Sequence, residues 1–514
     1  MNGAEALIAT LAAGGVNACF TNPGTSEMHL VAALDRRPEI RCVLGLFEGV
    51  VTGAADGYAR MTGKPACTLL HLGPGLANGL ANLHNAWRAN VPMVNLVGEH
   101  PASHRMRDSP LVSDIEGIAR PYSRWLRTSR SAAELGRDGT EAIQAARMAP
   151  GRIATLIVPA DAAWGEPGSL GPVPVTLAPA LPPAERIERV AGLLRLGLPT
   201  AFLLFGSALH GRGLAAAAEI AGATGAKLLC PYPLVRMERG AGRACVERIP
   251  YVPEQAKEAL KDFRQFMLVG VDVPIAYFAS PGRKADLVPA GCRIETLAKS
   301  DEDVTGALEA LATLLPAENS KPLLEAPARP AVPTGSITLQ GLAVAVAALL
   351  PDGCIVVDES MTSGRAMLVA AKGAGTHDWL GNPGGSIGIA IPLAVGAAVA
   401  CPERRVLCLS ADGSGMYTVQ GLWTMARDGL NVTTVIFANR AYSVLQREFR
   451  NMAGGTPGPR AANLFEIGRP DLDWVALAKA MGVPGTRVTS LEAFGQALER
   501  GFAAEGPSLI EVPL

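Results

Sequence analysis

The stretch VLCLSADGSGMYTVQGLWTMARDGLNVTTVIFANRA, residues 406–441, carries the pattern that decides the fold of this chain. It contains two apolar, strand-like runs, 406–409 and 432–437. Each run is followed directly by small and polar residues, at 411–415 and at 438–441. Ligands of open α/β sheets bind beyond the carboxyl ends of the strands. We therefore expect a binding site where these two runs end.

The same alternation recurs along the chain. Further apolar runs at 67–71, 93–97 and 201–204 alternate with Ala-rich helical patterns. This predicts the α/β class, with parallel sheets wrapped by helices. Two Pro/Ala-rich stretches with little amphipathic periodicity, around 169–183 and 316–334, divide the 514 residues. The predicted domains are 1–168, 184–318 and 335–514.

Composition and charge limit the class of partner. Lys and Arg number 46 against 47 Asp and Glu, a net charge of -1, so neither a nucleic acid nor a membrane surface is expected as a partner. The nine cysteines occur singly, without metal or disulfide spacing, which suits a reducing cytoplasm. The most apolar run, 387–400, is too short to span a bilayer and contains Pro392, so we interpret it as a buried core helix. The expected partners are small molecules.

Asp412 and Asn439 are the candidate metal ligands. Each follows one of the two runs, so a carboxylate and an amide can meet at neighbouring strand ends. Mg²⁺ prefers such oxygen ligands and completes its shell with phosphate oxygens. A tight turn would explain Asp412-Gly413-Ser414 alone, but the second strand-end side chain favours a metal site. No GxxxxGK[ST] motif and no clean GxGxxG motif after a strand is present, so a nicotinamide-dependent dehydrogenase is not expected.

This pattern resembles the thiamine diphosphate enzyme family, whose metal motif is Gly-Asp-Gly followed at a distance by Asn. Ala411 and Ala438 depart from the usual motif, but neither position supplies a metal ligand. The resemblance implies Asp412, Asn439 and the carbonyl of Ala441 as ligands of Mg²⁺. It also implies contacts with thiamine diphosphate at Gly413, Ser414, Tyr442 and Thr362.

Glu48 is the candidate acid that activates the cofactor. It is the first residue of a helical pattern. Position alone would suggest an exposed first-turn glutamate whose negative charge interacts favourably with the helix dipole. However, Phe47-Glu48-Gly49 together with residues 54–60 resembles the family segment whose glutamate bonds the aminopyrimidine ring. By the same resemblance, the Gly385 carbonyl accepts the amino group and Ile387 is the apolar wedge that folds the cofactor.

The substrate pocket resembles two branches of the family. Residues 22–27 and His71 look most like benzoylformate decarboxylase, whereas residues 73–78 look more like acetolactate synthase. The resemblance implies that Thr25 replaces a serine that holds the substrate carboxylate and that His71 relays protons. The second pocket histidine of the decarboxylases is not evident. Further expected pocket residues are Ser26, Tyr277, Phe278 and Leu445.

The resemblance implies decarboxylation of a 2-oxo acid through a C2 ylide and an enamine, in a homodimer or homotetramer with active sites between subunits. An acetolactate synthase-like carboligase stays open, although residues 205–210 show no clear flavin motif and FAD is not expected. A 2-hydroxyacyl or oxalyl coenzyme A lyase is a further alternative. So is a catalytically silent paralogue, although Ala411, Ala438, Phe47 and Met361 remove no required functional group.

Overall fold

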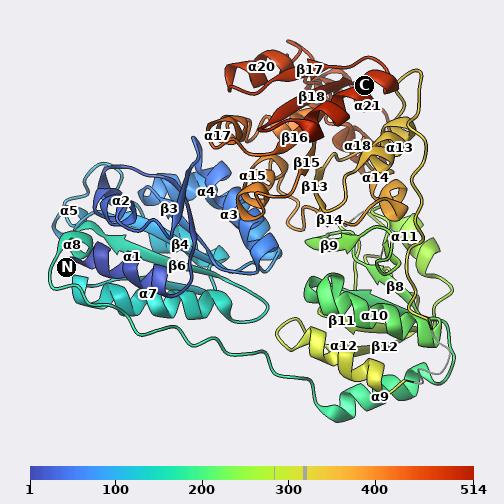
Figure 1. Cartoon of the computed structure of the whole chain (residues 1–514), viewed down its shortest axis with the longest axis horizontal. Coiled ribbons are helices and arrows are strands. Elements are labelled where there is room, and N and C mark those ends of the chain that lie inside the picture. The colour runs from blue at the N-terminus through green and yellow to red at the C-terminus, as the bar shows by residue number, and fades with distance from the viewer. Residues whose placement is uncertain (280, 283, 316–320) are drawn as a thin grey trace.

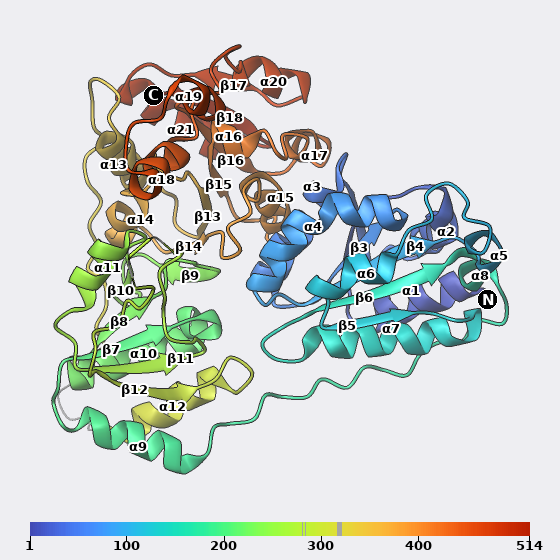
Figure 2. The same ribbon diagram turned by 180° about the vertical axis from the view of Figure 1, so that it is seen from behind.

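The computed structural model describes residues 1–279, 281–282, 284–315 and 321–514, so the predicted boundary at residue 318 lies outside the described part. These residues form three β-sheets wrapped by helices, which confirms the predicted α/β class (Figures 1 and 2). The sheets are called A, B and C in chain order. Residues 165–183, without helix or strand, run across the molecule from the sheet A part to the sheet B part (Figure 2).

Sheet A is fully parallel and has the strand order β2-β1-β3-β4-β6-β5. Its central strands are buried on both faces, as their continuous apolar sequences predict. Its strands are β1 (Ala18–Asn22), β2 (Arg41–Leu44), β3 (Ala66–Leu70), β4 (Met93–Glu99), β5 (Trp125–Thr128) and β6 (Ile153–Pro159).

Helices cover both faces of sheet A. One face packs against α1 (Gly3–Ala13), α2 (Met28–Asp35), α7 (Ala132–Arg147) and α8 (Ala160–Trp164). The other packs against α3 (Glu48–Thr62), α4 (Leu72–Arg88) and α6 (Ile115–Ala119). Short turns complete this part: η1 (Thr25–Glu27), α5 (Ala102–Arg105) and η2 (Arg120–Tyr122).

Helix α3 joins sheet A to the C-terminal part of the chain. It lies between sheet A and α15 (Ala390–Ala400), and nearly all its residues are buried, as expected for a helix covered on both sides. The two helices approach closely, because a Cβ at Gly57 would lie 2.1 Å from the carbonyl oxygen of Leu393. The run 387–400 is thus a core helix in its greater part, as predicted.

Sheet B is also parallel, with the order β10-β8-β7-β11-β12. Its strands are β7 (Thr200–Leu204), β8 (Lys227–Cys230), β10 (Val246–Arg248), β11 (Gln265–Val269) and β12 (Arg293–Ala298). One face packs against α9 (Ala184–Leu194), α10 (Gly211–Thr224) and α12 (Val304–Thr313), and the other against α11 (Pro253–Leu260). The turn η3 (Gly206–Leu209) follows β7.

Sheet C has the order β17-β18-β16-β15-β13-β14-β9. Six of these strands are parallel: β13 (Cys354–Glu359), β14 (His377–Leu380), β15 (Val406–Ala411), β16 (Val432–Ala438), β17 (Gly485–Arg487) and β18 (Ser508–Pro513). The seventh, β9 (Arg236–Arg239), comes from the middle part of the sequence and pairs antiparallel with β14. The predicted parallel sheets wrapped by helices are thus confirmed, and β9 adds one antiparallel edge strand from a distant segment.

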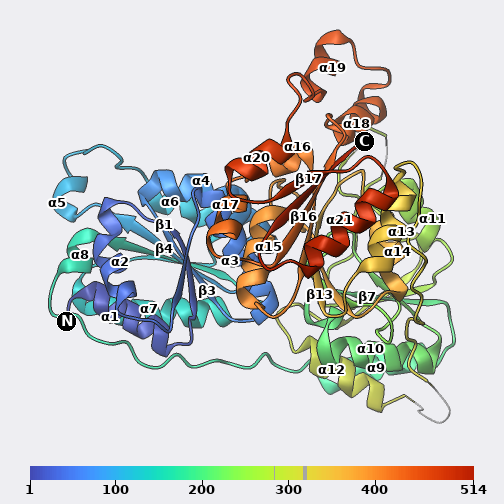
Figure 3. The ribbon, with the colours of Figure 1, turned by 45° about the horizontal axis from the view of Figure 1, so that its top comes forward.

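Helices also cover both faces of sheet C. One face packs against α13 (Leu339–Leu349), α14 (Met367–Ala370) and α21 (Leu491–Ala503), and the other against α15, α17 (Gly421–Arg427) and α20 (Trp474–Ala480). Helices α18 (Ser443–Ala453) and α19 (Pro459–Phe465) project from this part (Figure 3). The remaining turns are η4 (Ala371–Gly373) and α16 (Asp412–Gly415). No helix in the described ranges is long and apolar enough to cross a membrane.

Candidate active site

The carboxyl edge of sheet C brings the two predicted metal ligands together. Strands β15 and β16 are parallel neighbours, and Ala411 pairs with Phe437, so Asp412 and Asn439 follow adjacent strand ends. Both line one cavity of about 530 Å³. The sequence predicted this juxtaposition from the two apolar runs.

The local backbone fixes the orientation of both side chains. Asp412 accepts hydrogen bonds from the N–H of Gly413 (2.8 Å) and of Arg440 (2.7 Å). The Asn439 side-chain oxygen accepts one from the N–H of Ala441 (3.1 Å). Burial raises the pKa of Asp412, and the two N–H donors act against this rise.

These residues fit an Mg²⁺–diphosphate group. The carboxylate, the amide oxygen and the Ala441 carbonyl form an all-oxygen set of the kind that Mg²⁺ prefers. Gly413 is needed here, because a Cβ would lie 2.5 Å from the ring of Tyr442. No cluster of three His, Cys, Asp or Glu side chains that could hold a metal ion occurs in the described residues, so phosphate oxygens and water would complete the shell.

The Gly-rich segment before α15 lines the same cavity through Gly385 and Ile387. Gly385 has a φ of +78°, and a Cβ there would lie 1.9 Å from the hydroxyl oxygen of Tyr277. Glycine is therefore required at this position both for the backbone conformation and for the contact with Tyr277. Tyr277 thus lies against the segment expected to hold the pyrimidine.

Glu359 anchors this segment, a role that the sequence did not reveal. Its carboxylate accepts hydrogen bonds from the N–H groups of Gly388, Ile389 and Ala390, all between 3.1 and 3.2 Å, and from the Asn382 amide. Burial raises the pKa of Glu359 to about 7, against the opposing effect of these donors. The one available signal was its position at the end of an apolar strand, β13, at the same sheet edge.

Most of the other residues predicted in the C-terminal half also line this cavity. Thr362 follows Met361 in the turn after β13, and Ser414 lies in α16. Tyr442 and Leu445 lie at the start of α18, and Phe278 is half exposed at the cavity wall. The predicted cofactor-binding and pocket residues of this half therefore share one hollow.

Glu48 begins α3 at the carboxyl edge of sheet A and is only 7% exposed. Its two carboxylate oxygens accept from the side-chain amides of Asn22 (3.3 Å) and Asn78 (3.0 Å). The alternative of an exposed first-turn glutamate is thereby excluded. The amides instead hold the carboxylate in a fixed, buried orientation.

His71 pairs with Glu27, a partner that the sequence reasoning missed. The His71 Nδ1 lies 2.8 Å from Oε2 of Glu27, which is fully buried and also accepts from the N–H of Gly24 (2.8 Å). A Cβ at Gly24 would lie 2.2 Å from the His71 ring, and one at Gly98 would lie 1.7 Å from the other Glu27 oxygen. Glycines on both sides therefore make room for the pair. A carboxylate can only accept a hydrogen bond, so the Glu27 carboxylate favours the His71 tautomer with its proton on Nδ1. In the neutral ring, Nε2 is then the nitrogen without a proton and can accept one.

Three non-glycine residues at these strand ends adopt left-handed backbone conformations. They are Leu72 (φ 53°), Met361 (φ 51°) and Arg440 (φ 56°). Each directly follows or neighbours a predicted site residue. Strained conformations of this kind cluster at functional sites.

The structure does not bring all the predicted residues into one cavity. Of the described residues that line the 530 Å³ cavity, none precedes Tyr232. Thr25 and Ser26 lie in η1, beside His71, at the edge of sheet A that also carries Glu48. Within one chain, the predicted site thus consists of two separate halves.

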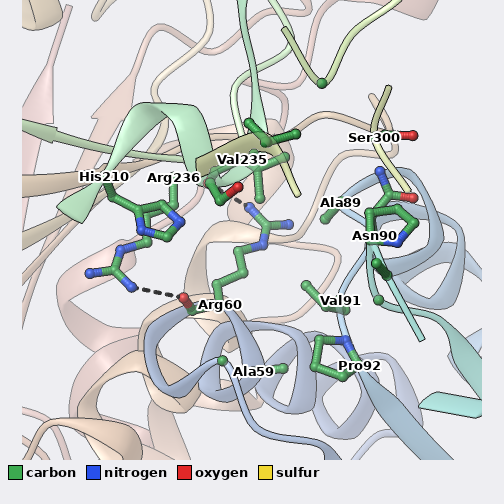
Figure 4. A pocket seen from close by; sticks show the side chains of 18 of the residues that line it. Ala59, Arg60, Ala89, Asn90, Val91, Pro92, His210, Val235, Arg236 and Ser300 are labelled. Carbon is green, nitrogen blue, oxygen red and sulfur yellow. Dashed lines mark hydrogen bonds between the residues drawn. The ribbon is translucent and has the colours of Figure 1, made fainter. Parts of the chain in front are cut away.

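A larger cavity, of about 820 Å³, lies where the sheet A part meets the sheet B part (Figure 4). Arg60 and Arg236 line it and connect the sheet A part to β9 of sheet C: Arg60 donates to the carbonyl of Val235, and Arg236 donates to the carbonyl of Arg60. None of the predicted site residues lines this cavity, so it is set apart from the candidate active site.

Comparison with known proteins identifies the family. The chain matches the thiamine pyrophosphate enzyme N-terminal TPP binding domain over residues 1–116 and the C-terminal TPP binding domain over residues 364–512. A Mycobacterium tuberculosis protein named "Putative acetolactate synthase large subunit IlvX" is 51% identical over 517 residues, covering 100% of this chain and 99% of that protein. The chain belongs to the thiamine pyrophosphate enzyme family.

Other members of the thiamine pyrophosphate enzyme family are also similar over their full length. The benzoylformate decarboxylase of Pseudomonas aeruginosa is 29% identical, covering 97% of this chain and 96% of that protein. The solved structure of a thiamine diphosphate-dependent 4-hydroxybenzoylformate decarboxylase from Rhodococcus jostii superposes with a TM-score of 0.87 at 25% identity, covering 100% and 99% of the two chains. The resemblance stated from the motifs is confirmed.

Proposed function

We propose that the chain catalyses decarboxylation of a 2-oxo acid with thiamine diphosphate and Mg²⁺. Two of its relatives are named as decarboxylases of 2-oxo acids of this kind. The observation that carries this proposal is the shared cavity of Asp412, Asn439, Gly385 and Ile387. A metal–diphosphate site and a pyrimidine site in one hollow match the two ends of a single cofactor. Bound thiamine diphosphate supplies the electron sink that stabilises the carbanion left by loss of CO₂.

The cofactor would be held mainly by the C-terminal part of the chain. Asp412, Asn439 and the Ala441 carbonyl would hold Mg²⁺. Hydroxyl and backbone donors suit the diphosphate, and apolar or carbonyl groups suit the rings. The residues that we propose contact the diphosphate and the rings in this way are Gly413, Ser414, Thr362, Gly385, Ile387 and Tyr442.

The proton-transfer groups lie on the sheet A part. Glu48 would share a proton with the pyrimidine ring nitrogen, in the orientation given by Asn22 and Asn78. His71, oriented by Glu27, would present Nε2 to the substrate. Thr25 and Ser26 would hold the substrate carboxylate through their hydroxyls. Tyr277, Phe278 and Leu445 would shape the pocket from the other half.

We further propose a homodimer as the smallest active form, with a homotetramer as the usual assembly. The support is the separation of the two halves, since Glu48 and His71 do not line the cavity that contains Asp412 in the same chain. A partner subunit would bring its own sheet A edge to this cavity. We retain three domains, about 1–168, 184–318 and 335–514, and a cytoplasmic location as parts of this proposal.

The test is turnover of purified protein with thiamine diphosphate, Mg²⁺ and a panel of 2-oxo acids, with CO₂ and organic products measured by mass spectrometry. Glu48→Gln should lower kcat by about 100-fold or more, the range for loss of a proton-transfer group. Glu39→Gln, at an exposed glutamate of the same part, is the matched control and should leave kcat unchanged. Unchanged turnover of Glu48→Gln would contradict the proposed role.

The same assay tests a carboligase as the second candidate. The 51% identity to the Mycobacterium tuberculosis protein named "Putative acetolactate synthase large subunit IlvX" favours this alternative. Release of CO₂ with aldehyde would identify a decarboxylase. Release of CO₂ with a 2-hydroxyketone or an acetohydroxy acid would identify a carboligase.

A further inference from the structure

One wall of the 530 Å³ cavity is formed by three tyrosines from the middle part of the chain, here called the tyrosine cluster: Tyr232, Tyr251 and Tyr277. The ring centroids are 4.9 Å apart for Tyr232 and Tyr251, 5.8 Å for Tyr251 and Tyr277, and 6.4 Å for Tyr232 and Tyr277. The Tyr277 hydroxyl lies against Gly385, so the cluster reaches the segment expected to hold the cofactor. A substrate group bound next to these rings would therefore lie close to the site of the proposed decarboxylation.

Three arginines line the same cavity and contact these rings; they are called the arginine rim. The guanidinium carbon of Arg248 lies 4.8 Å from the centroid of Tyr232. Those of Arg365 and Arg447 lie 5.9 and 5.4 Å from the centroid of Tyr251. The three come from β10, from the turn after β13 and from α18, so separate segments converge at this point.

The charge of the rim is only partly compensated. Arg447 is 3.3 Å from the carboxylate of Glu448, but neither Arg248 nor Arg365 forms an ion pair with any of the residues that the structure describes. Burial, and secondly the neighbouring Arg447, lower the pKa of Arg365. Two guanidinium groups close enough to repel each other favour an anion between or beside them.

The acidic residues of the cavity are already engaged. Glu359 accepts from three backbone N–H groups, and Asp358 accepts from Ser360 and from the Trp379 indole. Burial, and secondly Glu448, raise the pKa of Tyr251 to about 12, so its hydroxyl stays neutral. The other two acidic residues of the cavity are Glu448, which pairs with Arg447, and Asp412, the candidate metal ligand. None of the four therefore pairs with Arg248 or Arg365, whose planar, multi-donor cations stay open to a further anion.

We propose that the arginine rim binds a second anionic group on the substrate, a carboxylate or a phosphonate in addition to the carboxylate next to the reacting carbonyl. This inference rests on the proposed function and specifies its substrate class. Guanidinium groups bind carboxylate and phosphoryl oxygens through paired donors. An apolar substrate side chain would instead desolvate Arg248 and Arg365 without replacing the lost water.

The test compares substrates that differ only in the second charge. 2-Oxoglutarate is paired with 2-oxopentanoate, and 3-phosphonopyruvate with 2-oxobutanoate, in the same decarboxylation assay with thiamine diphosphate and Mg²⁺. We expect kcat/KM to be about tenfold or more higher for the dianionic member of at least one pair, the size of one charged hydrogen bond. The pair that shows the preference distinguishes the dicarboxylate from the phosphonate.

Two variants test the residues themselves. Arg248→Gln and Arg365→Gln should each reduce the preference about tenfold, by lowering kcat/KM for the substrates with the second anionic group and not for the monoanionic substrates. Arg450→Gln, at an exposed arginine of α18 outside the cavity, is the matched control and should keep the preference. Equal losses for monoanionic and dianionic substrates, or no preference in the parent protein, would overturn the inference. A higher dissociation constant for thiamine diphosphate in the variants, with an unchanged preference between substrates, would also overturn the inference, because the arginine rim would then bind the cofactor.

A binding measurement separates this inference from the proposed function. If no 2-oxo acid releases CO₂, the proposed function fails, and the rim is then judged by thermal unfolding of the protein with thiamine diphosphate and Mg²⁺. A rise in Tm with 2-oxoglutarate or 3-phosphonopyruvate in the parent protein that is lost in both variants supports the rim. A rise that is absent, or equal in the variants, refutes it.

Discussion

Replacing Arg60 with methionine should destabilise the protein severely, because Arg60 is a buried cation that links three parts of the chain. The side chains of Arg60 and Asp56 are fully buried, and they form two hydrogen bonds of 2.7 and 2.6 Å within α3. The remaining Arg60 donors reach the carbonyl of Val235 (3.1 Å; Figure 4) and the carbonyl of Gly381 (2.6 Å). Arg60 therefore ties the sheet A part to the β9–β14 edge of sheet C, through one segment from the middle and one from the C-terminal part of the sequence.

The magnitude follows from what the substitution leaves behind. Burial raises the pKa of Asp56, and Arg60 opposes this rise, so without Arg60 the carboxylate is buried and uncompensated. Breaking a buried ion pair on one side costs about 3–5 kcal/mol, a large part of the 5–15 kcal/mol typical of a folded protein. Removing both charges with Asp56→Leu and Arg60→Met should cost less than Arg60→Met alone.

The assay is urea unfolding at one fixed protein concentration, followed by tryptophan fluorescence and by loss of the proposed oligomer. Coincident transitions would justify a single free energy of unfolding. A loss below about 1 kcal/mol for Arg60→Met would refute the argument, because that is the range of exposed ion pairs. A double variant less stable than Arg60→Met would equally refute the explanation by an uncompensated Asp56.

Three further predictions concern the site and the core. Asp412→Asn should weaken binding of thiamine diphosphate with Mg²⁺ by about tenfold or more, measured by calorimetric titration; unchanged affinity would contradict a metal ligand. Glu27→Gln should lower kcat/KM about 10- to 100-fold and shift its pH profile, because His71 loses its anionic partner; an unshifted profile would limit Glu27 to packing. Burial lowers the pKa of His377 to about 4, against the opposing hydrogen bond to the Gly375 carbonyl, so the unfolded chain binds the proton first as the pH falls. Stability should therefore fall by about 3 kcal/mol between pH 6.5 and 4, and His377→Gln should remove that part of the slope in unfolding experiments; equal slopes would contradict it.

The sequence could predict the site wherever short-range patterns and strand order coincide. Asp412 and Asn439 each follow an apolar run, and adjacent pairing of β15 and β16 placed both at one cavity. The fold class and the family were predictable for the same reason, since alternating runs and Gly-rich turns are local features. The roles given to individual residues stay predictions.

Contacts between distant segments could not be predicted in this way. His71 and Glu27 are separated by 44 positions, and the glycines that make room for them belong to other strands and turns. β9 joins sheet C from the middle of the sequence, and no periodicity in 236–239 marks its partner. The tyrosine cluster and the arginine rim likewise converge from separate segments. Such contacts depend on packing, which local propensity does not encode.

The antiparallel strand β9 has a consequence for motion at the cavity. It belongs in sequence to the middle part, yet its ladder with β14, from His377 opposite Arg239 to Leu380 opposite Arg236, makes it a structural member of sheet C. Swinging the middle part away from sheet C would break this ladder, and regions that share such pairing open together rather than separately. The segment that leads from Tyr232 to Tyr251 is thus held to the sheet that carries the candidate metal ligands, so widening the cavity on this side requires β9 to separate from β14.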